Sequence, residues 1–181
     1  MRRWAPAEAP AAHLRILLAV ATWAEALPLV GFHPVVTGMG ARVPSLAGYE
    51  RVVSAGFAGA CDPALRAGDL VTGPLETLDH IASPAEKAAL RGTGVQAVDM
   101  EGRWLAAAAA EAALPFTSVR VVIDRVQDPA FSLATAAAFP RAALALRRAV
   151  VAVLTAPVPL PPPQERLGER THPTGGDGAG A

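Results

Sequence analysis

The sequence predicts an α/β fold with a mostly parallel sheet. Short runs of apolar or β-branched residues recur along the chain, as is typical of strands buried on both faces of such a sheet. Alanine-rich segments that carry helix start and stop signals lie between and after these runs. In a fold of this class, ligands bind at the carboxyl ends of the strands, so we expect the functional residues there.

The predicted strands differ in how each one ends. The first is a nearly continuous apolar run, LRILLAVA, and the second and third lead into glycine turns at 38–40 and 56–59. Glycine permits a positive φ and lets backbone N–H groups approach a ligand, so both turns are candidate binding segments. The last strand is rich in β-branched residues and is closed by Asp124. In order, the predicted strands cover residues 14–21, 35–37, 51–55, 70–72 and 117–123.

Three helical segments are predicted in the second half of the chain. The first begins with a capping box, in which Ser83 is the N-cap and Glu86 the third helical residue, and Gly92 limits it to about two turns. The second, residues 100–113, is alanine-rich and ends before Pro115. The third, residues 133–155, is expected to be a helical hairpin or a kinked helix because Pro140 interrupts it.

Composition predicts one domain and excludes several classes of function. Of the 181 residues, 1–12 and 157–181 are rich in proline and glycine and are expected to be a disordered leader and tail around one domain, residues 13–156. Sixteen basic and sixteen acidic residues balance, which argues against nucleic-acid binding and a polybasic membrane anchor. No apolar run reaches the roughly 18 to 20 residues of a membrane helix. The single cysteine, Cys61, excludes an internal disulfide and favours a cytoplasmic location.

Three acidic residues stand where such a sheet places its ligands. Glu25 follows the first predicted strand, Glu101 begins the long alanine-rich helix, and Asp124 ends the last strand. Each also has a purely structural interpretation: a solvated residue of a first helical turn, an acid favoured by a helix N-terminus, and a turn-forming residue after a strand. Spacing alone does not decide between these interpretations.

The amino-acid sequences of four segments, taken in order along the chain, favour the functional interpretation. The third and fourth are the most specific, because they combine a glycine turn, a Gly-Asp pair, a Met-Glu helix start and a strand that ends in aspartate. The segments are RILLAVATWAEA (15–26), TGMG (37–40), VVSAGFAGACDPALRAGDLV (52–71) and AVDMEGRWLAAAAAEAALPFTSVRVVIDRVQD (97–128). With them the chain resembles the nucleoside phosphorylase and nucleosidase superfamily, in particular its methylthioadenosine/S-adenosylhomocysteine nucleosidases, hopanoid-associated phosphorylases and futalosine hydrolases. The resemblance implies a three-layer sandwich with a central mixed, mostly parallel sheet, here in truncated form.

The resemblance also implies roles for individual residues. Asp124 matches the aspartate that protonates the purine base, and Glu25 matches the acid that activates the attacking water. Glu101 matches the glutamate that binds the ribose hydroxyls. Met100 is expected beside the sugar, with ordinary core packing as the alternative, and Arg120 is expected to support the site by pairing with an acid. The glycine turns add four candidate substrate-binding residues: Gly40, Phe57, Ala58 and Gly59.

We therefore expect hydrolysis of the N-glycosidic bond of a purine nucleoside or thionucleoside. Phosphorolysis is the first alternative, because Arg42 lies next to a glycine turn and could hold a phosphate oxygen. The second is a non-catalytic nucleoside-binding remnant, because only residues 70–98 join the Gly-Asp turn to the Met-Glu helix, where relatives carry several tens of residues, including strands and an aromatic that stacks on the base. Most of the base pocket is then expected to be missing.

Two further departures from the superfamily are expected to matter. Ile123 stands where relatives often have serine or asparagine, and the helix after the first glycine turn is shortened to residues 41–50. Neither metal nor cofactor is expected, since His33 and His80 lack metal-ligand spacing and Cys61 lacks an activating neighbour. The only expected partners are a nucleoside substrate and further copies of the chain in a homo-oligomer.

Overall fold

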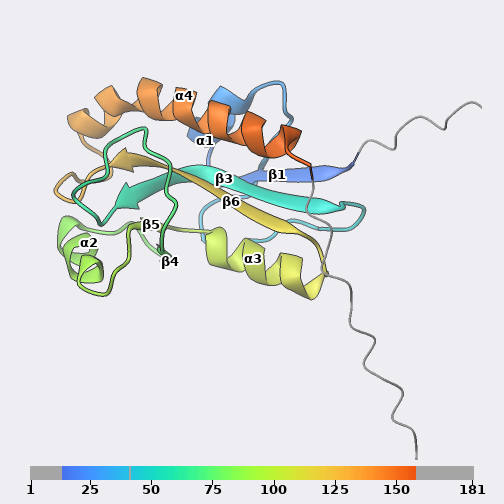
Figure 1. The fold of residues 1–181 in the computed structure, drawn as a ribbon, viewed down its shortest axis with the longest axis horizontal. Helices are drawn as coiled ribbons and strands as arrows, with labels where there is room; N and C mark the ends of the chain where they lie inside the picture. Colours follow the sequence, from blue (N-terminus) through green and yellow to red (C-terminus); the bar gives the residue numbers. More distant parts are fainter. Residues whose placement is uncertain (1–13, 41, 158–181) are drawn as a thin grey trace, which may run out of the picture.

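A computed structural model describes residues 14–40 and 42–157 as three layers, with a central sheet between two layers of helices (Figure 1). The expected disorder of residues 1–12 and of the tail beyond residue 157 lies outside the described residues. No helix within the described ranges is long and apolar enough to cross a membrane.

The sheet is mixed and mostly parallel, which confirms the predicted fold class. The long strand β3 pairs in parallel with β1 on one side and β6 on the other, while its last two residues pair antiparallel with β5. β1 also pairs in parallel with β2, and β5 with β4. The strands are β1 (Ile16–Val20), β2 (Val35–Val36), β3 (Arg51–Ala60), β4 (Leu75–Thr77), β5 (Ala97–Asp99) and β6 (Phe116–Asp124).

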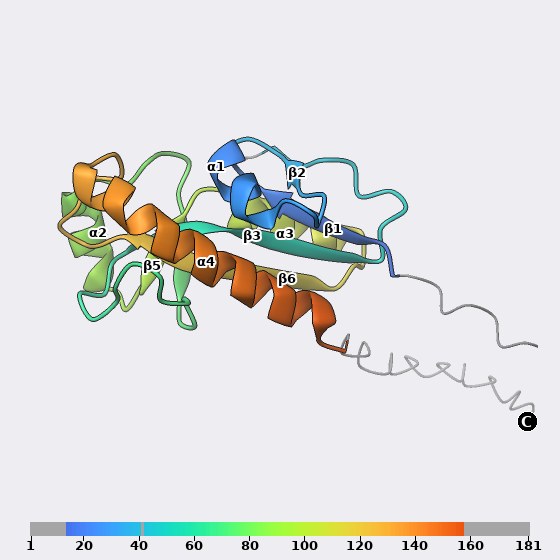
Figure 2. The ribbon, with the colours of Figure 1, turned by 90° about the horizontal axis from the view of Figure 1, so that it is seen from above.

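Each face of the sheet has its own apolar core. On one face lie the long helix α4 (Leu133–Thr155), the short α1 (Trp23–Ala26) and the 3-10 turn η1 (Leu27–Leu29) (Figure 2). Leu146 of α4 packs there among β-strand residues such as Val121. On the other face lie α2 (Pro84–Arg91) and α3 (Gly102–Glu111), and Leu105 of α3 packs against Val52. Between these two cores, the parallel pairing of β1, β3 and β6 places their carboxyl ends at one edge of the sheet.

Two of the predicted breaks do not occur. The expected glycine turn at 56–59 is wrong, because β3 continues through it to Ala60, paired with β6 along its length. The last helix was expected to be a hairpin or to be kinked. The hairpin is wrong, because α4 is one helix that passes through Pro140. Pro140 is exposed, so water can satisfy the carbonyl that its missing N–H leaves unpaired.

Other elements differ in extent. Residues 70–72 form no strand, and only Leu70 bridges to Val121. The three-residue strands β4 and β5 were not predicted, since so short a run carries no readable periodicity. The expected helix at 41–50 is wrong, because residues 42–50 are irregular. The capping box is as predicted: Ser83 Oγ accepts from Glu86 N at 3.3 Å, and Glu86 Oε2 accepts from Ser83 N at 2.8 Å.

Candidate active site

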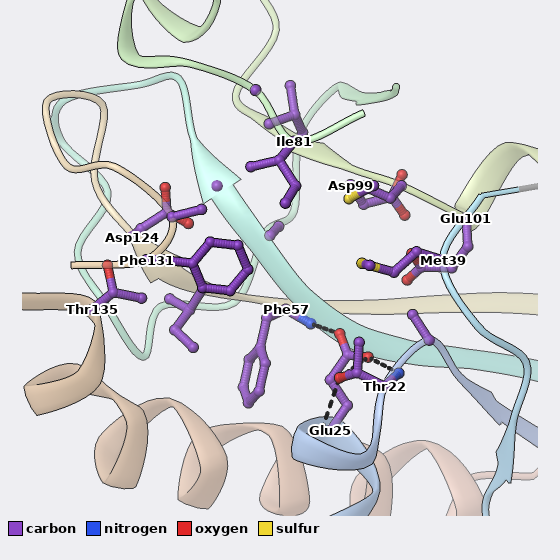
Figure 3. Close-up of a pocket in the computed structure, with 18 of the residues that line it drawn as sticks. Thr22, Glu25, Met39, Phe57, Ile81, Asp99, Glu101, Asp124, Phe131 and Thr135 are labelled. Carbon is purple, nitrogen blue, oxygen red and sulfur yellow. Dashed lines mark hydrogen bonds between the residues drawn. The ribbon is translucent and has the colours of Figure 1, made fainter. Parts of the chain in front are cut away.

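The carboxyl ends of β1, β3, β5 and β6 surround a cleft of about 410 Å³. Glu25, Glu101 and Asp124 all line it, although more than twenty residues separate each from the next in the chain. Figure 3 shows Asp124 and Phe131 at one end, and Glu25, Glu101 and Met39 at the other. The cleft is thus divided into an end with Asp124 and Phe131 and an end with three acids, since Asp99 lies beside Glu101.

Glu25 is oriented by hydrogen bonds to both of its carboxylate oxygens. Oε2 accepts from the backbone N of Thr22 at 2.8 Å and from its hydroxyl at 3.1 Å, which makes Glu25 part of the capping box of α1. Oε1 accepts from the backbone N of Phe57 at 2.8 Å and so joins α1 to β3. Glu25 therefore serves as a helix-capping residue and lines the cleft, with its side chain held in one position.

Gly56 leaves the space in which two of the acids meet. A Cβ at this position would lie 2.5 Å from Glu25 Oε1 and 3.3 Å from Glu101 Oε1. Burial raises the pKa of Glu101 to about 7, an effect that the neighbouring carboxylate of Glu25 strengthens and Arg120 opposes. Glycine is needed here for the close approach of side chains to the backbone and not, as the sequence suggested, for a turn.

The buried guanidinium of Arg120 compensates part of the negative charge at this end of the cleft. Its guanidinium donates to Asp99 Oδ2 at 2.7 Å and to Ser54 Oγ at 2.8 Å, and lies 3.1 Å from Glu101 Oε1. Asp99 also accepts from the hydroxyl of Thr77 at 2.6 Å. Arg120 is almost wholly buried and is absent from the residues that line the cleft. It therefore pairs with acids, as expected, but acts on a ligand only through Asp99 and Glu101, which both line the cleft.

Asp124, at the opposite end, is paired with a buried lysine. Lys87 of α2 donates to Asp124 Oδ2, to the carbonyl of Arg125 at 2.7 Å and to that of Asp128 at 2.8 Å. Burial raises the pKa of Asp124, and the ammonium of Lys87 opposes that rise. Gly59 makes room for the pair, since a Cβ there would lie 3.3 Å from both Asp124 oxygens and from Lys87 Cδ.

Most of the remaining cleft wall is apolar. Phe131, which is 87% exposed, and Ile81 flank the end that holds Asp124. Ile81 belongs to the connection 70–98, so that short segment still supplies a wall of the cleft where most of the base pocket was expected to be missing. Ile123 adds apolar surface next to Asp124. An exposed aromatic ring beside an acid suits a flat heteroaromatic ligand.

The structure brings most of the sequence-predicted residues together. Besides the three acids, Phe57, Ala58, Gly59 and Met100 line the cleft. Gly40 and Arg120 do not, and Met39 lies at the cleft in place of Gly40, which has the expected positive φ of 85°. Cys61 is buried, and burial raises the pKa of its thiol, as suits a packing residue.

Sequence reasoning missed three groups at the site: Lys87, Phe131 and Asp99. Lys87 had a readable signal, because it is the only lysine of the chain and shares a helix face with Leu90, three residues later. Asp99 precedes the Met-Glu pair and lies on β5, a strand that was not predicted. Phe131 is a lone aromatic in a loop, which carries no pattern.

His80, at the mouth of the cleft, provides a pH-dependent contact. Its two ring nitrogens lie 2.8 Å from Asp79 Oδ1 and 2.7 Å from Glu86 Oε1, and these hydrogen bonds raise the pKa of His80 above 6.5. The protonated ring stabilises the fold below that value, so this contribution is lost as pH rises through the folded-state pKa. We expect an NMR titration to place the His80 pKa above 6.5, and Asp79→Asn to lower it without touching the capping box. Equal values in both proteins would contradict this.

Comparisons with known proteins find one matching family model and several solved structures of similar fold. The model of the phosphorylase superfamily matches residues 76–155, from β4 to the end of α4. Among solved structures, CT263 (MTAN) from Chlamydia trachomatis aligns with a TM-score of 0.64 at 20% identity, covering 77% of this chain and 97% of that one. The 5′-methylthioadenosine/S-adenosylhomocysteine nucleosidase (MTAN) of Helicobacter pylori gives 0.66 at 14%, covering 78% and 98%. Futalosine hydrolase of Helicobacter pylori gives 0.65 at 14%, covering 78% and 97%.

The superfamily resemblance is confirmed. At these identities the solved structures show the fold alone, and no curated protein matches the chain. The segment matched by the phosphorylase superfamily model contains Lys87, Glu101, Arg120 and Asp124, whereas Glu25 lies outside it. For the part of the cleft that precedes residue 76, the comparisons therefore show the fold alone.

Proposed function

We propose that the chain is a nucleosidase, which hydrolyses the N-glycosidic bond of a purine nucleoside or thionucleoside. The observation that carries the proposal is the single cleft in which Glu25, Glu101 and Asp124 converge from separate strands and helices. Buried carboxyls that face one another destabilise a fold, so an arrangement of this kind favours a function over a structural role. The Chlamydia trachomatis protein has been solved bound to adenine, and a point variant of it bound to MTA, which supports the choice of substrate class.

The two ends of the cleft suit the two halves of a nucleoside. Breaking the bond builds positive charge on the sugar and negative charge on the departing base. At the end with Phe131 and the apolar wall, the Asp124 carboxyl would donate its proton to a ring nitrogen of the base. At the other end Glu25 would take a proton from the water that attacks C1′, and Glu101 would accept hydrogen bonds from the ribose hydroxyls. Proton transfers of this kind contribute roughly 10²- to 10⁴-fold each.

Hydrolysis is favoured over phosphorolysis by the cations at the cleft. Of the described cationic groups that line it, Lys87 is committed to Asp124 and two carbonyls, and both nitrogens of His80 contact carboxylates. Arg42 is the one observation that favours phosphate, since its guanidinium packs 3.4 Å from the Cβ position of Gly38. It is exposed and does not line the cleft. A phosphate anion would thus find few free donors.

The deciding experiment is base release from a small nucleoside panel, with and without phosphate. The panel holds methylthioadenosine, S-adenosylhomocysteine, inosine, adenosine and futalosine. We expect at least one to release its base without phosphate, and Asp124→Asn to abolish most of that release. Release strictly dependent on phosphate would establish phosphorolysis instead. Tight binding of a nucleoside without release would establish the binding remnant.

A further inference from the structure

The only lysine among the sixteen basic residues of the chain is buried against Asp124. Its side chain is fully buried, and the other fifteen basic residues are arginines. A charged amine inside a protein is costly unless its hydrogen bonds are complete. Lys87 meets that condition with three acceptors: Asp124 Oδ2 and the carbonyls of Arg125 and Asp128.

The number of acceptors fits a lysine ammonium and not a guanidinium. Three acceptors surround a single nitrogen, and an ammonium carries three N–H groups on one nitrogen, so all are used. A guanidinium has five N–H groups in a planar fork, and several would remain buried without partners. The three acceptors therefore suit a compact ammonium that contacts one oxygen of the Asp124 carboxylate. No hydrogen bond from a described side chain occupies the other oxygen, Oδ1.

We propose that Lys87 is the positioning residue of the acid: its ammonium holds Oδ2 of Asp124 and stabilises the carboxylate that remains when Asp124 gives up its proton. The inference rests on the proposed function, in which Asp124 protonates the leaving base. As the C1′–N bond breaks, its electron pair goes to the base, the Asp124 proton moves to a base nitrogen, and water adds to C1′ and loses a proton to Glu25. The new carboxylate at Asp124 lies in an apolar wall, beside Ile123, where Lys87 is the cation among the described residues that pairs with it.

Two other titratable groups, Cys61 and Asp128, lie near the pair of Lys87 and Asp124. The thiol of Cys61, at the end of β3, senses both charges, and burial raises its pKa. The carboxylate of Asp128 raises the pKa of Asp124, but Arg125 Nε lies 3.1 Å from it and compensates part of its charge. Lys87 is thus the main cation acting on Asp124 from any element packed against it.

The kinetic test compares the pH dependence of kcat/KM in three variants. Because protonated Asp124 is the active form, the rate should fall as pH rises through its pKa. Lys87→Met removes the cation, so this descending limb should move to higher pH by about 1 to 3 units, with a lower plateau rate because the acid is weaker. Lys87→Arg keeps the charge, although its guanidinium leaves N–H groups without partners, so it should move the limb less than Lys87→Met does. Arg91→Met removes an exposed cation from the same helix and should leave the limb in place. A limb that stays in place in folded Lys87→Met overturns the proposal.

A second test needs neither activity nor a Lys87 variant. Lysine labelled with ¹⁵N gives one side-chain signal, because the chain has one lysine. We expect its Nζ shift to change in one step as Asp124 releases its proton, and Asp124→Asn to remove that step. If the step is present but no nucleoside is cleaved, the nucleosidase function fails while the coupling of the pair stands. If the step is missing, the inference fails whatever the kinetics.

Discussion

Asp124→Asn is expected to lower kcat/KM for base release from a purine nucleoside by about 10²- to 10⁴-fold. The amide keeps the size of the carboxyl and a hydrogen bond to the base, but it cannot give up a proton at neutral pH. Since the departing purine must be neutralised as the bond breaks, the loss falls on the transition state. We therefore expect kcat to fall much more than KM rises. Steady-state kinetics with the nucleoside identified by the panel measures both.

The leaving group distinguishes loss of the acid from general damage. An aryl riboside with a nitrophenolate leaving group departs without protonation, so Asp124→Asn should lose much less rate with it than with the purine nucleoside. Glu25→Gln is the matched variant, because it would impair the attack of water and should slow both substrates alike. It keeps an oxygen to accept from Phe57 N and so preserves the link from α1 to β3. Equal losses for both substrates in Asp124→Asn would contradict its role as the acid.

The sequence predicts well those elements that a local residue pattern determines. β1 and β6 follow from continuous apolar or β-branched runs, and α2 from its capping box. The convergence of Glu25 and Asp124 follows from their places after β1 and β6, because parallel strands bring their carboxyl ends to one edge. Glu101 follows β5, which pairs antiparallel with β3 and was not predicted, so its place at the cleft was indicated by the resemblance alone.

What the sequence does not predict depends on contacts distant along the chain. Gly56 lies within a strand and not in a turn, because β3 has partners on both sides and two carboxylates occupy the space beside it. The pairing of Lys87 with Asp124 joins a helix to a strand end 37 residues away, and no local pattern in the sequence reports it. Phe131 lines the cleft from the irregular segment between β6 and α4, whose path depends on tertiary contacts.

Arg120→Met is expected to give the largest loss of stability, about 3–5 kcal/mol in the free energy of unfolding. Arg120 lies between two buried acids, Asp99 and Glu101, and methionine fills much of its volume without its charge. The variant therefore leaves carboxylates buried without a cation. Arg103→Met is the control, because Arg103 is half exposed and lies 3.9 Å from Glu76, and such surface pairs contribute within about 1 kcal/mol. Urea unfolding of both variants measures the difference.

The pH dependence of that loss identifies its cause. Burial already raises the pKa of Glu101 from 4.5 to about 7, and removing Arg120 should raise it further. The folded protein then holds a proton that the unfolded chain has released, so stability falls as pH rises from about 4.5 through the folded-state pKa. The wild type and Arg120→Met should therefore differ more at pH 8 than at pH 5. An equal difference at both values would assign the loss to packing alone, and Arg120 would not be the group that keeps Glu101 ionised to receive a sugar hydroxyl.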